Sequence, residues 1–160
     1  EKTFTCAANT NEIPVYKIND KNLAVLICAD AWYPESYTYL QNNSVDILVV
    51  PSFVAGNNTW KTKWKGYNGA ATPIDVEKTD IGKISEHDAW LKYAMMNRTL
   101  KSDIKTGVNV FLRGDLWNLG SDGNTLVTTT EYFKPLNIPE VFEGTNKIDK
   151  SGSLINIWLP

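Results

Sequence analysis

A cysteine at the end of an apolar run is the residue of this chain best placed for chemistry. Residues 23–27 are all apolar and lead directly into Cys28, while Pro34 and Glu35 follow shortly after it. The apolar run predicts a buried strand, and Pro followed by Glu predicts the start of a helix. The partial positive charge and free N–H groups of a helix N-terminus favour the thiolate form of a cysteine. The spacing therefore predicts a reactive Cys28; the alternative is a small buried residue at a strand end.

The elements that must position Cys28 alternate between strands and helices. Two buried strands joined by a helical crossover form a parallel pair, and this order predicts an α/β layered fold. In the second helix, Ser85 and Asp88 have the spacing of a capping box, and Gly107 is expected to end the helix. The expected elements are strands at 22–28, 45–51, 108–112, 124–129 and 153–159, helices at 34–41 and 86–104, a glycine-punctuated turn at 114–123 and irregular chain at 131–150.

A long segment without periodicity, residues 52–84, follows the second strand. It contains Trp60, Trp64 and Tyr67. A loop of this length inside a compact domain is usually functional, and loops at the carboxyl ends of parallel strands carry ligand sites in α/β folds. We therefore expect this loop to form part of the pocket rim, with its three aromatic side chains as an apolar wall that binds substrate.

Composition excludes several classes of protein. The chain has 160 residues, 42% of them hydrophobic, and a net charge of -2, as expected for one globular domain. It contains no basic cluster and no apolar run long enough for a bilayer, so we expect neither nucleic acid nor a membrane as partner. Two cysteines, Cys6 and Cys28, make no disulfide framework and indicate a reduced, cytoplasmic protein. With His87 as the only histidine, we expect no metal and no cofactor.

The pattern Cys28, Asp30, Pro34, Glu35 resembles the nucleophile motif of the nitrilase, or carbon–nitrogen hydrolase, superfamily. Four further blocks resemble the same superfamily in the same order: residues 46–53, 90–98, 107–111 and 120–127. The resemblance implies an α/β fold that is part of a four-layer α-β-β-α sandwich. The chain begins at Glu1 rather than at a methionine, which indicates a processed chain or a piece of a longer one. We interpret residues 1–160 as a single, incomplete domain, the C-terminal half of that fold.

The resemblance also implies a mechanism. A Glu–Lys–Cys triad would hydrolyse a small amide, or less readily a nitrile, through a cysteine thioester. Cys28 would be the nucleophile, and the backbone N–H of Ala29 would donate to the oxyanion. Glu1 resembles the accessory carboxylate of the family. The base and the lysine lie further upstream in the family, so both are expected before residue 1.

Within the chain, the candidates for these two roles are few. Lys2, Lys17 and Lys21 are the lysines before Cys28, and Glu12 is the further candidate base. Solvated surface residues are the simpler interpretation of Lys17 and Lys21. The substrate would be a small molecule, and the chain would associate with itself or with a missing N-terminal half.

Other interpretations remain open. The chain could be a non-catalytic subunit that keeps the nitrilase fold for assembly or binding, with residues 52–84 as a partner surface. A Cys28–His87 dyad and a thiol redox protein are weaker alternatives, since His87 lies in a polar first turn and no C-x-x-C motif exists. Asp30 is interpreted as a helix cap, and Glu35 as a charge that complements the helix dipole.

We predict that Cys28 reacts with alkylating reagents faster than Cys6, because a strand end followed by a helix favours a thiolate and the polar N-terminal segment does not. Limited alkylation near pH 7 followed by peptide mapping measures both sites in one sample. Equal labelling, or labelling of Cys6 first, would contradict an activated Cys28.

Overall fold

The computed structural model describes residues 9–56, 58–67, 72–112, 120, 122–129 and 140–143. The elements are, in chain order, the 3-10 helix η1 (Thr10–Glu12), strands β1 (Val15–Ile18) and β2 (Lys21–Val25), the 3-10 helix η2 (Cys28–Trp32), helix α1 (Pro34–Asn42), strand β3 (Ile47–Ser52), the 3-10 helices η3 (Thr59–Lys61) and η4 (Lys78–Asp80), helices α2 (Glu86–Tyr93) and α3 (Met95–Leu100), and strands β4 (Thr106–Phe111), β5 (Leu126–Thr129) and β6 (Glu140–Glu143). In this part of the chain, no helix is long and apolar enough to span a membrane.

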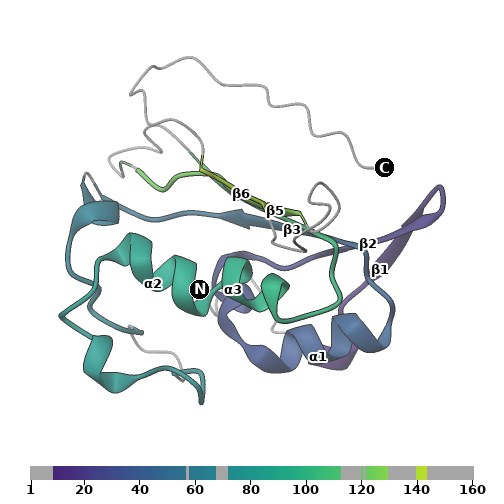
Figure 1. The fold of residues 1–160 in the computed structure, drawn as a ribbon, viewed down its shortest axis with the longest axis horizontal. Helices are drawn as coiled ribbons and strands as arrows, with labels where there is room; N and C mark the ends of the chain where they lie inside the picture. The colour runs from purple at the N-terminus through teal and green to yellow at the C-terminus, as the bar shows by residue number, and fades with distance from the viewer. Residues whose placement is uncertain are drawn as a thin grey trace, which may run out of the picture.

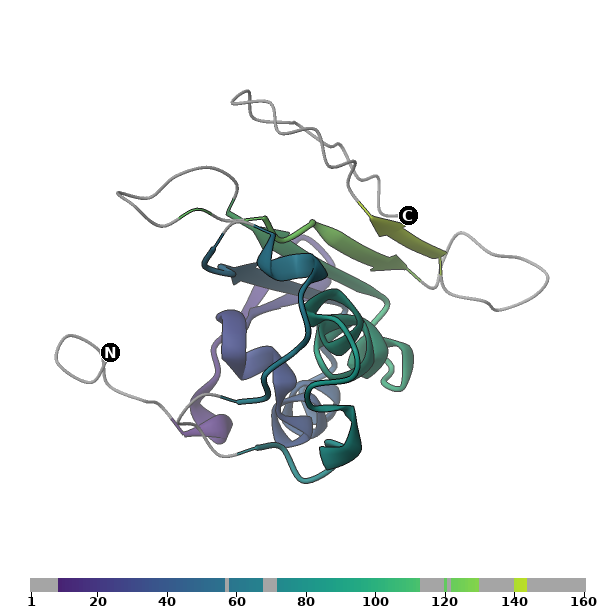
Figure 2. The ribbon, with the colours of Figure 1, turned by 90° about the vertical axis from the view of Figure 1, so that its left-hand side faces the viewer.

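One sheet of six strands forms the frame of the molecule, in the order β1-β2-β3-β4-β5-β6. Strands β2, β3 and β4 are parallel, with Val25 opposite Val49 and Val49 opposite Val108. Strands β1, β5 and β6 pair antiparallel with their neighbours. Helices α1, α2 and α3 lie together on one face of the sheet (Figures 1 and 2). The predicted α/β class is confirmed, and the described residues form one sheet and one layer of helices.

Two predicted helix starts are confirmed by their caps. Pro34 occupies the first position of α1, where its missing N–H costs no hydrogen bond. At α2, the N–H of Asp88 donates to Ser85 Oγ at 3.0 Å, and the N–H of Ser85 donates to the Asp88 carboxylate at 3.4 Å. These reciprocal bonds fix the entry of the chain into the second helical segment.

The single helix predicted at 86–104 is wrong, because the structure contains two shorter helices. The chain leaves helical geometry at Ala94, whose ψ is -159°. The Asn97 side-chain amide donates to the Lys92 carbonyl at 2.6 Å, which satisfies an acceptor that the break leaves free. Residue spacing alone does not show such a break, since the apolar face continues through it.

Gly107 does not end a helix but lies inside β4, which begins at Thr106. A Cβ at this position would lie 2.9 Å from the hydroxyl oxygens of both Thr99 and Thr128, and would also collide with the Met95 sulfur. The glycine therefore allows α3 to approach the sheet closely.

The C-terminal part differs from expectation in one element. Residues 131–150 were expected to be irregular, but β6 lies within that range and pairs with β5, with Val127 opposite Phe142. The predicted strand at 153–159 and most of the turn at 114–123 lie outside the described residues.

The expected apolar wall of Trp60, Trp64 and Tyr67 needs correction, because two of these rings belong to the core. Trp60 is 3% exposed and Trp64 2% exposed. Trp64 stacks on Tyr93 at 5.6 Å between ring centroids, and Trp60 packs edge-on against Phe111 at 4.9 Å. Both rings fill space between the long loop and the helix layer, so neither forms an exposed wall.

We predict that Trp64→Ala lowers the free energy of unfolding by about 3–5 kcal/mol, because it removes a buried ring and leaves a cavity. Urea unfolding followed by circular dichroism measures the change. Ile74→Ala is the matched control, since Ile74 lies in the same long loop but is 90% exposed. Equal, small effects of both substitutions would contradict a core role for Trp64.

Candidate functional site

The carboxyl ends of the three parallel strands meet at one edge of the sheet. Cys28 follows β2, Phe53 follows β3 and Leu112 follows β4. The strand ladder continues to this edge, since the N–H of Leu26 donates to the Val49 carbonyl at 3.1 Å. Open α/β sheets bind ligands outside this edge. The structure thus places Cys28 where this type of fold holds its functional groups.

Cys28 begins η2 rather than an α-helix, because α1 starts only at Pro34. This corrects the expectation that the cysteine stands at the mouth of the α-helix itself. The φ of Cys28 is 49°, in the left-handed region that side chains other than glycine rarely adopt. Such a conformation costs about 1–3 kcal/mol and persists only where surrounding contacts impose it. The half-buried thiol faces the end of β3 and donates to the Phe53 carbonyl at 3.7 Å.

The residues directly after Cys28 provide a free backbone N–H, at Ala29, and a cap for the turn, at Asp30. Ala29 is exposed, and no residue in the described part of the chain accepts a hydrogen bond from its backbone N–H. Asp30 has the capping role expected for it, since its carboxylate accepts from the Ile27 N–H at 3.3 Å. A free N–H beside a thiol is the arrangement that an oxyanion donor requires.

The carbonyl groups of η2 accept hydrogen bonds from side chains of other elements. The Tyr67 hydroxyl donates to the Ala29 carbonyl at 3.3 Å, and the Tyr37 hydroxyl donates to the Ala31 carbonyl at 2.9 Å. Arg98 Nη2 donates to the Trp32 carbonyl at 2.5 Å. The long loop, α1 and α3 each supply one of these donors. The turn is thus held from three directions.

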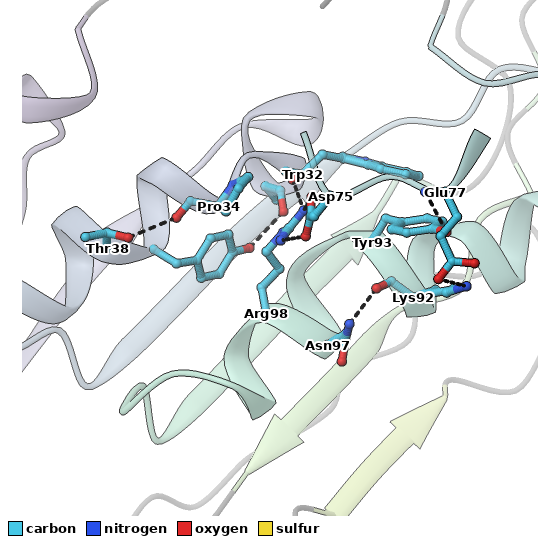
Figure 3. A network of polar contacts seen from close by, with 11 residues as sticks. Trp32, Pro34, Thr38, Asp75, Glu77, Lys92, Tyr93, Asn97 and Arg98 are labelled. Carbon is cyan, nitrogen blue, oxygen red and sulfur yellow. Dashed lines mark hydrogen bonds and ion pairs between the residues drawn. The ribbon is translucent and has the colours of Figure 1, made fainter. Parts of the chain in front are cut away.

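Arg98 also binds a carboxylate of the long loop, as Figure 3 shows. Its Nη1 and Nη2 donate to the two carboxylate oxygens of Asp75 at 2.6 and 2.9 Å, while its side chain is 9% exposed. The hydrogen bonds from Arg98 lower the pKa of Asp75, although burial acts in the opposite direction. The charged, bidentate pair therefore joins the long loop to α3 beside the Cys28 turn.

The sequence analysis missed Arg98 and Asp75. A signal for Arg98 existed, because helical spacing places it among the buried residues Met95, Met96 and Thr99. A charged residue at an interior position of a helix requires a partner. That partner was not visible in the sequence, since Asp75 lies in a segment without periodicity.

Trp32 fixes the other end of the turn in an aromatic cluster. Its ring lies 5.1 Å from Trp90, 5.2 Å from Tyr67 and 5.6 Å from Trp64, measured between centroids. Edge and stacked contacts of this kind add stability beyond the buried area. The chain after Cys28 is therefore anchored to both the long loop and α2.

Tyr67 is the one aromatic residue of the three candidates that the structure brings to the Cys28 turn. Its ring packs edge-on against Trp32, and its hydroxyl reaches the Ala29 carbonyl. Burial is the main cause that raises the pKa of Tyr67, and the nearby Tyr33 and Cys28 add to it. Its hydroxyl therefore stays protonated and can donate.

Other candidates do not meet Cys28. Glu1 and Lys2, like Cys6, lie outside the described residues. Lys17 is exposed on β1, and Lys21 begins β2, at the end opposite Cys28. Both agree with the surface interpretation.

Glu12 and His87 have other contacts. The Glu12 carboxylate accepts from the Asn9 N–H at 2.9 Å. The His87 ring lies 5.2 Å from Trp60, and its Nδ1 lies 3.6 Å from the Asp88 carboxylate. The hydrogen bond described for the Cys28 thiol goes to neither residue but to the Phe53 carbonyl.

No group of three metal-ligating side chains exists among the described residues. A hollow of about 530 Å³ lies between η4, α2 and α3, lined by Asp80, Leu91, Asn97 and other residues, and does not include Cys28. The thiol and its neighbouring donors, rather than a metal or this hollow, form the candidate site.

Comparison with known proteins agrees with these features. Residues 2–68 match the family described as carbon-nitrogen hydrolase. No curated protein sequence matches the chain. Among solved structures, a cysteine-to-alanine mutant of an amidase of the nitrilase superfamily from Nesterenkonia AN1 superposes with a TM-score of 0.53 at 16% identity, over 84% of this chain and 38% of that one. Another structure of an amidase from Nesterenkonia sp. gives a TM-score of 0.49 at 18% identity, over 82% of this chain and 38% of that one.

The chain therefore spans well under half the length of these amidases, and the structural likeness concerns the fold. The family match includes the Cys28 turn, Tyr67 and the strands that position them. Residues 2–68 are thus similar to carbon–nitrogen hydrolases, and the described part of the chain shares its fold with an amidase of the nitrilase superfamily.

Proposed function

We propose that the full-length protein containing this chain hydrolyses the carbon–nitrogen bond of a small amide, or less readily of a nitrile, with Cys28 as the nucleophile. The observation that carries this proposal is the geometry of the Cys28 turn. A half-buried thiol in a left-handed conformation ends a parallel strand, and the unpartnered N–H of Ala29 lies beside it. A nucleophile next to a preorganised donor fits acyl transfer.

The reaction follows from these groups. The Cys28 sulfur attacks the amide carbon, and the carbonyl oxygen gains negative charge that the Ala29 N–H stabilises. The carbon–nitrogen bond breaks, the amine leaves with a proton, and a thioester remains on the sulfur. Water then attacks the thioester, which releases the carboxylic acid and regenerates the thiol. Proton transfers in both halves require a general base and acid.

Those proton transfers need groups that the described residues do not bring to Cys28. The hydrogen bond that the structure describes for the thiol goes to a backbone carbonyl, that of Phe53. We propose that the base and the lysine come from sequence that precedes residue 1, as the family resemblance implies. Glu1 would then be an accessory carboxylate.

The long loop, residues 52–84, would form the rim of the site together with Gly120 and Asp122, which follow β4. The Gly56 N–H donates to the Gly120 carbonyl at 2.7 Å, and the Trp60 N–H lies 3.2 Å from the Asp122 carboxylate oxygens. These bonds tie the segment after β3 to the segment after β4. Of the three aromatic residues, we propose Tyr67 for substrate contact, because its hydroxyl donates to the Ala29 carbonyl, next to Cys28.

We predict that the full-length protein hydrolyses small aliphatic amides and that Cys28→Ala abolishes turnover. We also predict that the 160-residue chain alone is inactive, since loss of general acid–base catalysis costs about 10²–10⁴-fold and loss of an oxyanion donor about 10²–10³-fold. The assay measures ammonia released from a panel of amides and nitriles by the two forms. Each form is paired with its own Cys28→Ala variant.

Two outcomes would change this proposal. Turnover by the 160-residue chain that disappears in Cys28→Ala would mean that its own residues complete the triad, with Lys2 and Glu12 as the first candidates. No turnover of any amide or nitrile by a folded full-length protein would favour a non-catalytic subunit that uses the fold for assembly or binding.

We further propose that the chain associates through the sheet face opposite the helices. In the described part of the chain, no helix lies on this face (Figure 2). Val25 and Val110 are 37% and 45% exposed there, and Ile27 and Leu112, just beyond the same strands, are 64% and 48% exposed. Exposed apolar side chains that gather on one face of a sheet favour an interaction site. Its occupant would be a preceding half-domain or a second copy of the chain.

We predict that the 160-residue chain self-associates and that Val110→Lys reduces this association, because a charge would enter an apolar contact. Sedimentation velocity over a range of concentrations measures the change. Ile74→Lys is the matched control, since it adds the same charge at a residue that is 90% exposed in the long loop. Equal loss of association in both variants would contradict a contact through this face, and a monomeric wild-type chain would exclude a second copy as its occupant.

A further inference from the structure

We infer that Arg98 is a positioning residue for Cys28, holding the strained nucleophile turn through the Trp32 carbonyl and through Asp75. The argument rests on three bonds from one buried guanidinium: Nη2 to the Trp32 carbonyl at 2.5 Å, and Nη1 and Nη2 to the Asp75 carboxylate at 2.6 and 2.9 Å. The hydrogen bonds described for Arg98 go to the Trp32 carbonyl and Asp75, whereas that of the thiol goes to the Phe53 carbonyl, so the role we assign to Arg98 is to fix the turn and not to take part in the chemistry.

The turn needs such support because its own geometry is unfavourable. Cys28 has a φ of 49°, and the turn that it begins is a five-residue 3-10 helix. Its short ladder of hydrogen bonds leaves carbonyl groups without partners inside the turn. An isolated peptide with these residues would relax to negative φ at Cys28. Contacts from outside the turn must therefore impose the conformation.

Three side chains supply those contacts, and Arg98 is the strongest of them. Tyr37 and Tyr67 each donate one neutral hydrogen bond to the turn. Arg98 is charged and 9% exposed, and it bridges the turn to a second segment. Hydrogen bonds from an ionised donor are about twice as strong as neutral ones. Because the planar guanidinium is held by both oxygens of Asp75, its donor to Trp32 points in a fixed direction.

The hydrogen bond from Arg98 to the Trp32 carbonyl affects the position of the Cys28 sulfur. Trp32 closes the turn that Cys28 opens, and the chain enters α1 at Pro34, two residues later. If the Trp32 carbonyl loses its charged donor, the turn can shift and take the sulfur with it. Misplacement of a reacting group by about 1 Å can cost about 10²-fold in rate. The kinetic part of this inference rests on the proposed amidase function, whereas the effect on Cys28 conformation does not.

The experiment uses the full-length protein with Arg98→Met, Arg98→Lys and Asp75→Asn. Thr99→Val is the matched control, since Thr99 is the next residue of α3, is fully buried, and its hydroxyl donates within its own helix, to the Met95 carbonyl. The first readout is the ¹³Cα chemical shift of Cys28 in protein labelled with [¹³C]cysteine and assigned with Cys28→Ala. The second readout is kcat and KM for the best amide substrate.

We expect wild type and Thr99→Val to share one Cys28 signal with the shift of a left-handed residue. In Arg98→Met that signal should move or broaden, and kcat should fall by about 10²-fold with KM little changed. Arg98→Lys should recover part of both effects, because one ammonium can serve the Trp32 carbonyl or Asp75 but cannot reproduce the fork. Asp75→Asn should give a smaller change of the same kind.

Each outcome bears on the inference separately from the proposed function. An unchanged Cys28 signal in folded Arg98→Met overturns the positioning role, as does an equal loss of kcat in Thr99→Val. If wild type hydrolyses no amide but the signal moves in Arg98→Met, the proposed function fails and the positioning role stands. If Arg98→Met does not fold, Asp75→Asn decides: a moved signal supports the inference, and an unchanged one overturns it.

Discussion

The arrangement of the candidate site depends on the hydrogen bonds that the buried guanidinium of Arg98 makes. A charged group removed from water must find hydrogen-bond acceptors, and Arg98 finds them in the Trp32 carbonyl and the Asp75 carboxylate. This requirement brings three segments together: α3, the loop around residue 75 and the turn after β2. The entry to α1 follows from it, since that helix starts where the turn ends.

Packing of aromatic rings supports the same arrangement from the other side. Trp32 contacts Trp64 and Tyr67 of the long loop and Trp90 of α2, so the residue that accepts from Arg98 is also the centre of an aromatic cluster. The long loop has little regular structure, yet its aromatic residues make it part of the core. Polar and apolar contacts thus converge on one turn, whose first residue carries the thiol.

Much of the frame could be predicted from local sequence. Pro34 at a helix start and the Ser85–Asp88 cap each depend on neighbours along the chain, and both agree with the structure. The apolar run before Cys28 forms the predicted strand only as far as Val25, and Val25 and Ile27 are exposed rather than buried. The break at Ala94 could not be predicted, because Asn97 stabilises it by a bond to Lys92 that leaves the apolar spacing intact. Gly107 was misread for a related reason: its role is set by Thr99 of α3, which packs onto the sheet, and by Thr128 of the neighbouring strand β5.

For the candidate site, the sequence by itself determined the motif around Cys28, the strand–helix–strand order that follows it and the N–H of Ala29 next to the thiol, because these depend on residues that are close in the chain. The tertiary structure alone decided that Trp60 and Trp64 are buried, that Tyr67 reaches the Ala29 carbonyl, and that Arg98 meets Asp75. Side chains far apart in sequence meet only after the sheet has brought their elements together. These contacts depend on distances in the folded chain, which the spacing of residues along the sequence does not predict.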